Sequence, residues 1–241
     1  MLTQTIKDLR GLRLGPMAAC LEEWIDQPAN MHRTSLECVE AMVAAQIQAA
    51  ADKRAQRFMH EADLPTSICM ADVRPSASRG LSVRTFSDLC SCEWIRRGHS
   101  LVITGPSGAG KTYVASALGR EARLAELGVK YWRVPDLWAA FEEETDRAQR
   151  RKLSEQLIRV HLLILDDFAF QKATTSQGHE LLKIIDGRHR HHRSTMVVSP
   201  HHIKDWDDDF DDATTADGLC SRLIHKTEFI DLKPPPRKTA A

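Results

Sequence analysis

One glycine-rich stretch of the sequence has the residue types and spacing of a phosphate-binding loop. The apolar run 101–104 is followed at once by a G-x-x-x-x-G-K-T motif, and a helical pattern begins directly after it. Glycines let successive backbone N–H groups turn inward around phosphate oxygens, and the positive end of the following helix attracts the same charge. The motif and its strand–helix context predict an ATP-binding loop. Its eight residues are Gly105, Pro106, Ser107, Gly108, Ala109, Gly110, Lys111 and Thr112.

Two residues of this loop would contact the reacting end of the nucleotide. In such loops the lysine reaches the β- and γ-phosphates, and the hydroxyl that follows it binds Mg²⁺. These roles fall to Lys111 and Thr112. Kinases and GTPases share this kind of loop with ATPases, so the reaction has to be inferred from residues further along the chain.

Two consecutive acidic residues follow a run of four aliphatic residues. The run Leu-Leu-Ile-Leu occupies 162–165, and Asp166 and Asp167 come directly after it. The carboxyl end of a buried parallel strand opens onto the nucleotide site. We therefore expect Asp166 to hold Mg²⁺ and Asp167 to polarise a water that attacks the γ-phosphate. Two acids in sequence favour an ATPase over a kinase, although Asp167 could instead only cap the turn.

Two further polar side chains are candidates for completing the site. Ser199 ends the apolar run 195–198, where ATPases of the AAA+ kind place a polar residue that senses the γ-phosphate, but Pro200 beside it has no side-chain donor. Arg222 lies on the amphipathic stretch 215–225 and could act as an arginine finger on the γ-phosphate of a neighbouring subunit. On the sequence alone, an exposed ion pair is the more ordinary role for such an arginine.

A basic, histidine-rich cluster occupies residues 188–193, which read Arg-His-Arg-His-His-Arg. No supporting metal ligands are evident, so the ordinary interpretation is a solvated helix end. Contact with a phosphate backbone is the alternative.

The chain divides by pattern into four parts. Residues 1–62 have apolar positions at helical spacing and predict a small helical domain, and residues 63–98 predict a connector. Residues 99–233 alternate between strand-length apolar runs and helical patterns, which predicts a parallel sheet with helices on both faces. Residues 234–241 predict a flexible basic tail.

The expected elements can be placed more closely. A helix from Ser35 to about Met59 would begin at a cap formed by Thr34 or Ser35. A short helix is expected at 86–94. The expected strands are 101–104, 129–134, 162–165, 195–198 and 229–232, and the main expected helices are 112–127, 177–189 and 215–225.

Composition sets the broad class of the protein. The 241 residues suffice for one α/β domain and a smaller appendage, and Lys plus Arg equal Asp plus Glu at 33 each. A DNA partner therefore cannot be inferred from bulk charge. Of the six cysteines only Cys90 and Cys92 lie close together, which favours reduced thiols. No run approaches the ~18 apolar residues of a membrane span, so we expect a cytoplasmic protein without a membrane partner.

With these residues in place, the sequence resembles the IstB-type transposition helper ATPases, AAA+ proteins encoded beside the transposase in certain insertion sequences. The resemblance covers nearly the whole chain. Outside the P-loop and the acidic pair it rests on short segments, among them Arg79-Gly80-Leu81, Arg133-Val134-Pro135-Asp136-Leu137, Ile203-Lys204-Asp205-Trp206 and Ser221-Arg222-Leu223-Ile224-His225.

The resemblance implies a P-loop AAA+ fold preceded by a helical domain that makes oligomer and partner contacts. It implies ATP and Mg²⁺ as cofactors, an ATP-dependent homo-oligomer on duplex DNA without sequence preference, and a transposase as partner. It also strengthens the assignment of Arg222 as a finger acting in trans.

Two departures from the family pattern bear on hydrolysis. Pro200 stands where the family usually has Gln or Asn, and Ala169 where it usually has Gly. They point to slow hydrolysis or to sensing by Ser199 alone. A DnaC-type helicase loader and a nucleotide-gated DNA-binding module with little hydrolysis are the alternatives.

Overall fold

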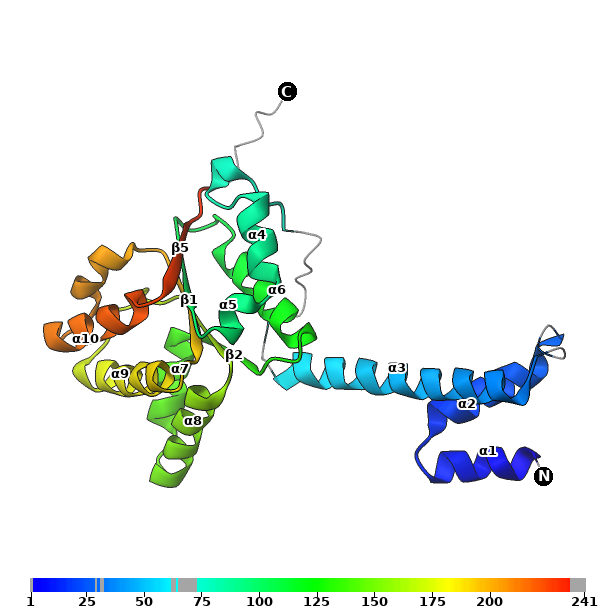
Figure 1. Ribbon diagram of the computed structural model, residues 1–241. Helices are drawn as coiled ribbons and strands as arrows, with labels where there is room; N and C mark the ends of the chain where they lie inside the picture. Colours follow the sequence, from blue (N-terminus) through cyan, green and yellow to red (C-terminus); the bar gives the residue numbers. More distant parts are fainter. Residues whose placement is uncertain (1, 29, 31–32, 62–63, 65–72, 235–241) are drawn as a thin grey trace. The chain divides into compact units, whose positions relative to one another are not determined.

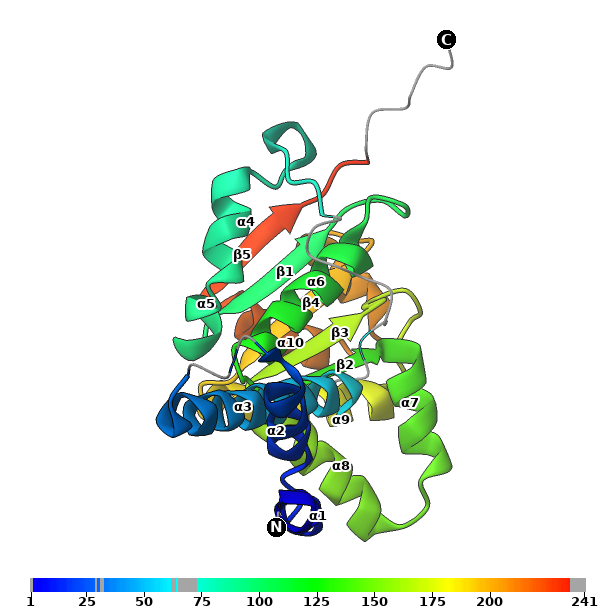
Figure 2. The same cartoon turned by 90° about the vertical axis from the view of Figure 1, so that its right-hand side faces the viewer.

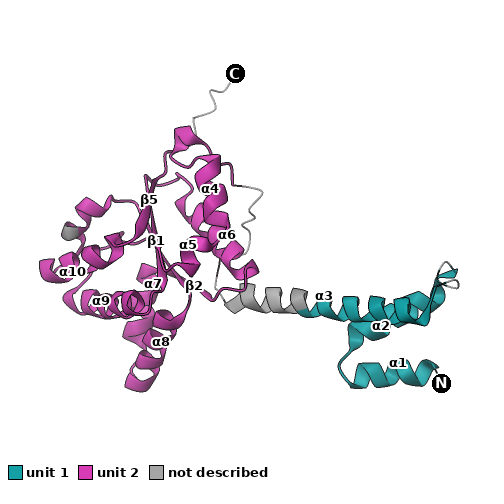
Figure 3. Cartoon of the chain, viewed as in Figure 1, with its two compact units in different colours: residues 1–57 teal, residues 58–241 magenta. Residues whose placement is uncertain are grey.

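The structure is a computed structural model that describes residues 2–28, 30, 33–61, 64 and 73–234 (Figure 1). The chain forms two compact units, residues 1–57 and 58–241 (Figure 3). Within the described residues, no helix combines the length and apolar character needed to cross a membrane.

The first unit is built from helices. These are α1 (Leu2–Gly11), α2 (Gly15–Asp26) and α3 (Ser35–Glu61), the last of which continues into the second unit. An ion pair between Arg10 and Glu22, at 2.7 Å, links α1 to α2. The start of α3 is a capping box: the Thr34 hydroxyl accepts from the Glu37 N–H, and the Glu37 carboxylate accepts from the Thr34 N–H. The helix therefore begins where the sequence predicted, with Thr34 as its cap.

The second unit contains a five-stranded sheet in the order β2-β3-β4-β1-β5, and all its neighbouring strands are parallel (Figure 2). The strands are β1 (Ser100–Thr104), β2 (Val129–Arg133), β3 (Leu162–Asp166), β4 (Ser194–Ser199) and β5 (Thr227–Asp231). Every residue of β3 and β4 is buried, which is typical of central strands covered on both faces. Each strand lies within two residues of the expected position.

Helices cover both faces of this sheet, as the sequence predicted (Figures 1 and 2). On one face Leu101 and Ile103 pack in a core with α4 (Val83–Cys90), α5 (Glu93–Arg96) and α6 (Lys111–Leu124). On the other face Val102 and Leu163 pack with α7 (Val134–Glu143), α8 (Arg147–Arg159), α9 (Thr175–Arg190) and α10 (Ala213–Ile224). Alternate strand residues thus serve two separate cores. Short 3₁₀ turns lie at Ala77–Arg79 and Ile203–Asp209.

The segment expected to form one helix at 86–94 forms two. The first, α4, begins earlier because the Ser82 hydroxyl accepts from the Thr85 N–H and caps it. It ends at Cys90, since Cys92 adopts a left-handed backbone conformation with φ of 58°. Trp94 then folds back, and its indole N–H donates to the Leu89 carbonyl. Both helices contribute to the core of the second unit.

The prediction of a solvated helix end was wrong for Arg188, which is only 1% exposed. This residue lies on the inward face of α9. Its Nε donates to the Thr195 hydroxyl at 3.0 Å and a terminal nitrogen to the Val160 carbonyl at 3.1 Å. It also donates to the carbonyls of Leu157 and Ser194. One guanidinium therefore satisfies backbone acceptors from the end of α8 and from the amino end of β4.

We expect Arg188→Ala to lower the free energy of unfolding by about 2–4 kcal/mol, because several buried acceptors lose their donor and a cavity opens. Arg190→Ala is the matched control on the same helix: its side chain is 72% exposed and pairs with Asp186 at 3.0 Å. That exposed pair should contribute less than about 1 kcal/mol. Urea unfolding of both variants measures the difference, and equal losses would contradict the structural role of Arg188.

Candidate active site

The glycine-rich loop joins β1 to α6 with the backbone geometry of a phosphate cradle. Gly105, Gly108 and Gly110 all have positive φ, at 138°, 78° and 88°. At Gly105 a Cβ atom would lie 2.1 Å from the Leu232 carbonyl oxygen, so no larger residue fits there. Helix α6 begins at Lys111, directly after the loop. The free N–H groups of its first turn therefore adjoin the cradle.

The Lys111 ammonium closes this loop on itself. Its Nζ donates to the Gly105 carbonyl at 2.7 Å and to the Pro106 carbonyl at 3.1 Å. Burial lowers the pKa of Lys111, while Asp166 and Asp167 act in the opposite direction. Phosphate oxygens can replace these two carbonyls as the acceptors of the Lys111 ammonium. Backbone N–H groups, a lysine and open space beside Gly108 fit the loop for a polyphosphate.

Asp166 is a buried carboxylate held from two sides. It is 2% exposed at the carboxyl end of β3. One of its oxygens accepts from the Tyr131 hydroxyl at 2.7 Å, and the other from the Asp167 N–H at 2.8 Å. Each oxygen keeps a second lone pair. Hard oxygen donors of this kind suit Mg²⁺, so Asp166 and the exposed Thr112 are fitted to hold it.

Asp167 has a different environment from its neighbour. Its backbone is left-handed, with φ of 53°, and its side chain is 33% exposed. Its Oδ2 atom accepts from Arg133 Nε and lies 2.8 Å from a terminal guanidinium nitrogen of the same residue. The Asp167 carboxylate therefore forms an ion pair with an arginine. The sequence had left open the alternative that this carboxylate only caps a turn.

Both partners of the acidic pair come from β2, and neither was expected from the sequence to have a role in the site. The β2–β3 register sets Arg133 opposite Asp166 and Tyr131 opposite Ile164. Tyr131 and Arg133 are two residues apart on a strand, which puts them on one face. Burial and the hydrogen bond to Asp166 raise the pKa of Tyr131, so its hydroxyl remains a donor. The sequence shows that Tyr131 and Arg133 lie on one face of a strand. It does not show that they pair with the two acids.

An arginine from the segment before α4 contacts the phosphate loop. Arg79 donates to the Ala109 carbonyl at 2.7 Å and to the Lys233 carbonyl at 3.3 Å. Gly80 beside it has φ of 84°, and a Cβ there would lie 1.9 Å from the Asp231 carbonyl oxygen. In the sequence, Arg79 and Gly80 contributed only to the family resemblance. They tie the loop to the end of β5.

Ser199 is at the carboxyl end of β4 and is fully buried. Its hydroxyl oxygen accepts from the Trp206 indole N–H at 3.2 Å and from the His201 N–H at 3.1 Å. Trp206 is itself fully buried and packs against Phe168, with ring centroids 4.4 Å apart and ring planes inclined by 48°. Ser199 is therefore linked through Trp206 to the residue that follows the acidic pair.

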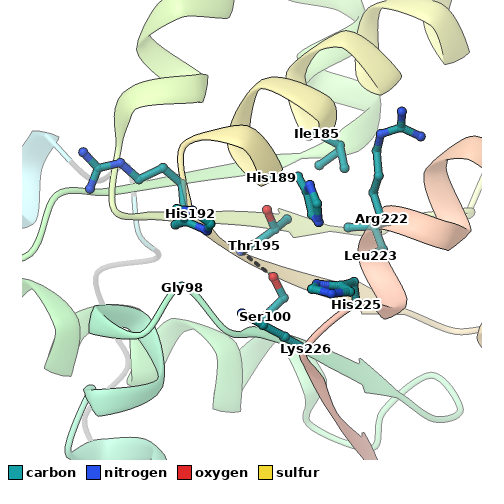
Figure 4. Close-up of a pocket in the computed structure, with 11 residues that line it drawn as sticks. Gly98, Ser100, Ile185, His189, His192, Thr195, Arg222, Leu223, His225 and Lys226 are labelled. Carbon is teal, nitrogen blue, oxygen red and sulfur yellow. Dashed lines mark hydrogen bonds between the residues drawn. The ribbon is translucent and has the colours of Figure 1, made fainter.

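Arg222 lies at the other edge of the sheet. It lines a cavity of about 70 Å³ together with Ser100 and Thr195, which stand at the amino ends of β1 and β4 (Figure 4). The phosphate loop follows the carboxyl end of β1, roughly 13 Å of strand away. The Arg222 guanidinium donates to Asp186 at 2.8 Å and to the Gly218 carbonyl at 2.8 Å. It therefore points away from the loop of its own chain.

Histidines from the basic cluster line the same cavity as Arg222. His189, His192 and His225 all border it, and the rings of His189 and His225 meet edge-on with centroids 5.2 Å apart (Figure 4). The cluster is thus divided: Arg188 is buried, whereas His189, His192 and Arg193 line the cavity beside Arg222.

The strand order, the phosphate loop after β1 and the acidic pair after β3 together define a P-loop nucleotide-binding domain of the AAA+ class. DnaA from Aquifex aeolicus with bound AMPPCP has this fold, with a TM-score of 0.59 and 20% identity over 71% of this chain; the chain spans about half, 51%, of that DnaA. A solved chain of the DnaC helicase loader gives a TM-score of 0.54 at 18% identity, and the match covers 73% of this chain and 99% of that solved chain.

The sequence identifies the family within that class. The chain belongs to the IstB-like ATP binding proteins, whose family model matches residues 7–237. An ATP-binding protein of insertion sequence IS1162 from Pseudomonas fluorescens is 35% identical over 201 residues, which make up 83% of this chain and 87% of the relative. An insertion-sequence ATP-binding protein of Sinorhizobium fredii is 30% identical over 95% of this chain and 93% of its own length.

Replacing Tyr131 by Phe removes only the hydroxyl that donates to Asp166. We expect the free energy of unfolding to fall by about 1–2 kcal/mol, because a buried carboxylate oxygen loses its donor. The Mg²⁺ concentration needed for half-maximal ATP binding should rise about ten-fold, since Asp166 is less firmly oriented. Titration of Mg²⁺ at a fixed concentration of a fluorescent ATP analogue measures the effect; an unchanged Mg²⁺ requirement would contradict the role of Tyr131.

Proposed function

We propose that this protein is an ATPase of an insertion sequence, which assembles with ATP on duplex DNA and recruits a transposase. The family and its insertion-sequence relatives support the biological setting. The observation that carries hydrolysis is the acidic pair at the end of β3, which lies at the same edge of the parallel sheet as the phosphate loop that follows β1.

Each residue of the site has a proposed part in the reaction. Lys111 binds the β- and γ-phosphates, and the N–H groups of residues 105–112 hold the remaining phosphate oxygens. Thr112 and Asp166 hold Mg²⁺, which when bound neutralises charge on the phosphates. Asp167 orients a water in line with the γ-phosphate and accepts its proton. Ser199 supports the site by fixing the end of β4 against Trp206.

The position of Arg222 supports a site that is completed by a second copy of the chain. An arginine at the amino edge of the sheet is remote from its own phosphate loop, yet it is half-buried and oriented by Asp186. Such an arginine can stabilise charge on the γ-phosphate of a neighbouring protomer. ATP would then bridge two copies, and hydrolysis would loosen the contact.

The first unit is the proposed contact region for other copies and for the transposase. Helix α3 exposes four large apolar side chains spaced three or four residues apart, which places them along one side of the helix. They are Leu36, Val39, Val43 and Ile47, between 43% and 67% exposed. A stripe of this kind suits contact with another helix. The free thiols of the described cysteines agree with the proposed cytoplasmic location.

Pro200 motivates a second candidate function, a nucleotide-gated DNA-binding module with little turnover. It directly follows β4 and has no side-chain donor for the γ-phosphate. Phosphate release measured with and without duplex DNA separates the two functions, because a binding module releases none under either condition. Capture assays that compare a transposase with a replicative helicase test the further alternative of a helicase loader.

We expect Lys111→Ala to abolish ATP binding and hydrolysis, and Arg222→Ala to abolish hydrolysis while ATP still binds. Each variant alone should be at least about 100-fold slower than the wild type. A one-to-one mixture should recover about a quarter of the wild-type rate, because one interface in four of a randomly mixed assembly joins an intact loop to an intact arginine.

Ser221→Ala serves as the control for Arg222→Ala, since it changes the neighbouring exposed position and leaves the guanidinium in place. A mixture no faster than its two components would contradict completion of the site by a second copy. Normal hydrolysis by the Lys111→Ala variant would contradict the assignment of the loop itself.

A further inference from the structure

Arg79 contacts one peptide unit of the phosphate loop. One of its terminal nitrogens donates to the Ala109 carbonyl at 2.7 Å. The peptide unit that carries this carbonyl also carries the Gly110 N–H, and in a trans peptide such as this one the two groups point in opposite directions. A donor that holds the Ala109 oxygen on one side of the loop therefore turns the Gly110 N–H to the other side.

The Gly110 N–H is open to a ligand. Within the part of the chain that the structure describes, no backbone carbonyl accepts it. Gly110 has φ of 88° and directly precedes α6, where unpaired N–H groups attract phosphate. A cation on the carbonyl also polarises the peptide, which makes its N–H a stronger donor. Arg79 thus acts on one of the groups that would hold a phosphate oxygen.

Arg79 is itself placed by backbone hydrogen bonds. It ends the 3₁₀ turn Ala77–Arg79, which Gly80 closes by donating its N–H to the Ala77 carbonyl. The Arg79 carbonyl accepts from the Lys233 N–H at 3.0 Å, and the Arg79 Nε donates to the Lys233 carbonyl at 3.3 Å. The guanidinium is therefore held between the phosphate loop and the segment that follows β5.

The end of β5 supports this contact. Strands β1 and β5 lie side by side, and the Leu232 N–H donates to the Thr104 carbonyl at 2.8 Å (Figure 2). The chain here passes so close to Gly80 and Gly105 that a Cβ atom would lie 1.9 Å and 2.1 Å, respectively, from a carbonyl oxygen. Backbone packed this closely cannot shift without a clash, so the turn holds Arg79 at a fixed distance from the loop.

Arg79 differs from Lys111 in its relation to the nucleotide. The Lys111 ammonium donates to two loop carbonyls, which phosphate oxygens can replace. The Ala109 carbonyl needs no replacement, because phosphate binds on the N–H side of its peptide. Arg79 therefore keeps its contact when nucleotide binds and acts without touching the ligand.

We propose that Arg79 is a positioning residue that directs the Gly110 N–H toward the phosphates and so sets the affinity of the loop for nucleotide. This inference rests on the proposed binding of ATP by the loop. ATP and ADP gain equally, because the backbone N–H groups of such loops hold the α- and β-phosphates that both nucleotides carry. The hydrolysis step does not depend on Arg79.

Two variants of Arg79 separate its hydrogen bond from its packing. Arg79→Met keeps an unbranched side chain without a donor, and we expect it to weaken ATP and ADP binding by about five- to ten-fold. Arg79→Lys keeps a charged donor and should bind both nucleotides within about three-fold of the wild type. At saturating ATP the kcat of both variants should equal the wild-type value, so that only KM rises for Arg79→Met.

Displacement of a fluorescent ATP analogue by ATP and by ADP measures the two affinities. Steady-state phosphate release gives kcat and KM, and thermal unfolding shows that each variant is folded. Arg84→Met is the matched control, because Arg84 is an exposed arginine on α4, five residues further along the chain. Its nucleotide affinities should equal those of the wild type.

Wild-type affinity in a folded Arg79→Met variant would overturn the inference and leave the ATPase function standing. An equal loss in Arg79→Lys would also overturn it, since a donor at this position would then not matter. A wild type that binds neither nucleotide would overturn the assignment of the loop together with the inference. If the wild type binds nucleotide without turnover, the ATPase function fails and the affinities alone decide the role of Arg79.

Discussion

Parallel pairing of β4 with both β1 and β3 brings the carboxyl ends of these three strands to one edge of the sheet. The phosphate loop leaves β1 at this edge, and the acidic pair leaves β3 there. A shift of one residue in any of these ladders would turn the buried side chains to the opposite face and separate the loop from the acids. The two cores, one on each face, hold the register because alternate strand residues belong to different cores.

Strand β2 supplies the side-chain hydrogen-bond donors of the acidic pair. It contributes a hydroxyl to the buried carboxylate and a guanidinium to the exposed one. A buried carboxylate must keep its hydrogen bonds, whereas a half-exposed one can exchange partners at little cost. The different roles proposed for Asp166 and Asp167 thus follow from depth in the fold. Their sequence positions alone do not distinguish them.

Local signals in the sequence were sufficient for the sheet, the helices on both faces and the phosphate loop, because glycine spacing and apolar runs report backbone geometry directly. Pairings between distant segments were not readable in this way. Tyr131 and Arg133 are more than thirty residues from the acids that they contact, and nothing in their strand marks those partners. Arg188 was expected in solvent because it is among charged residues, yet it lies on the inward face of α9 and donates to backbone carbonyls in the interior.

The two edges of the sheet carry complementary halves of one proposed site: the phosphate loop and acids at one edge, and Arg222 with its cavity at the other. We propose that neither half hydrolyses ATP without a second copy of the chain. The most direct test is the rate of phosphate release per protomer, at saturating Mg²⁺ and ATP, over a wide range of protein concentration. A rate per protomer that rises with concentration and then levels off is the expected result. A rate per protomer that stays constant down to the lowest concentration would contradict the claim.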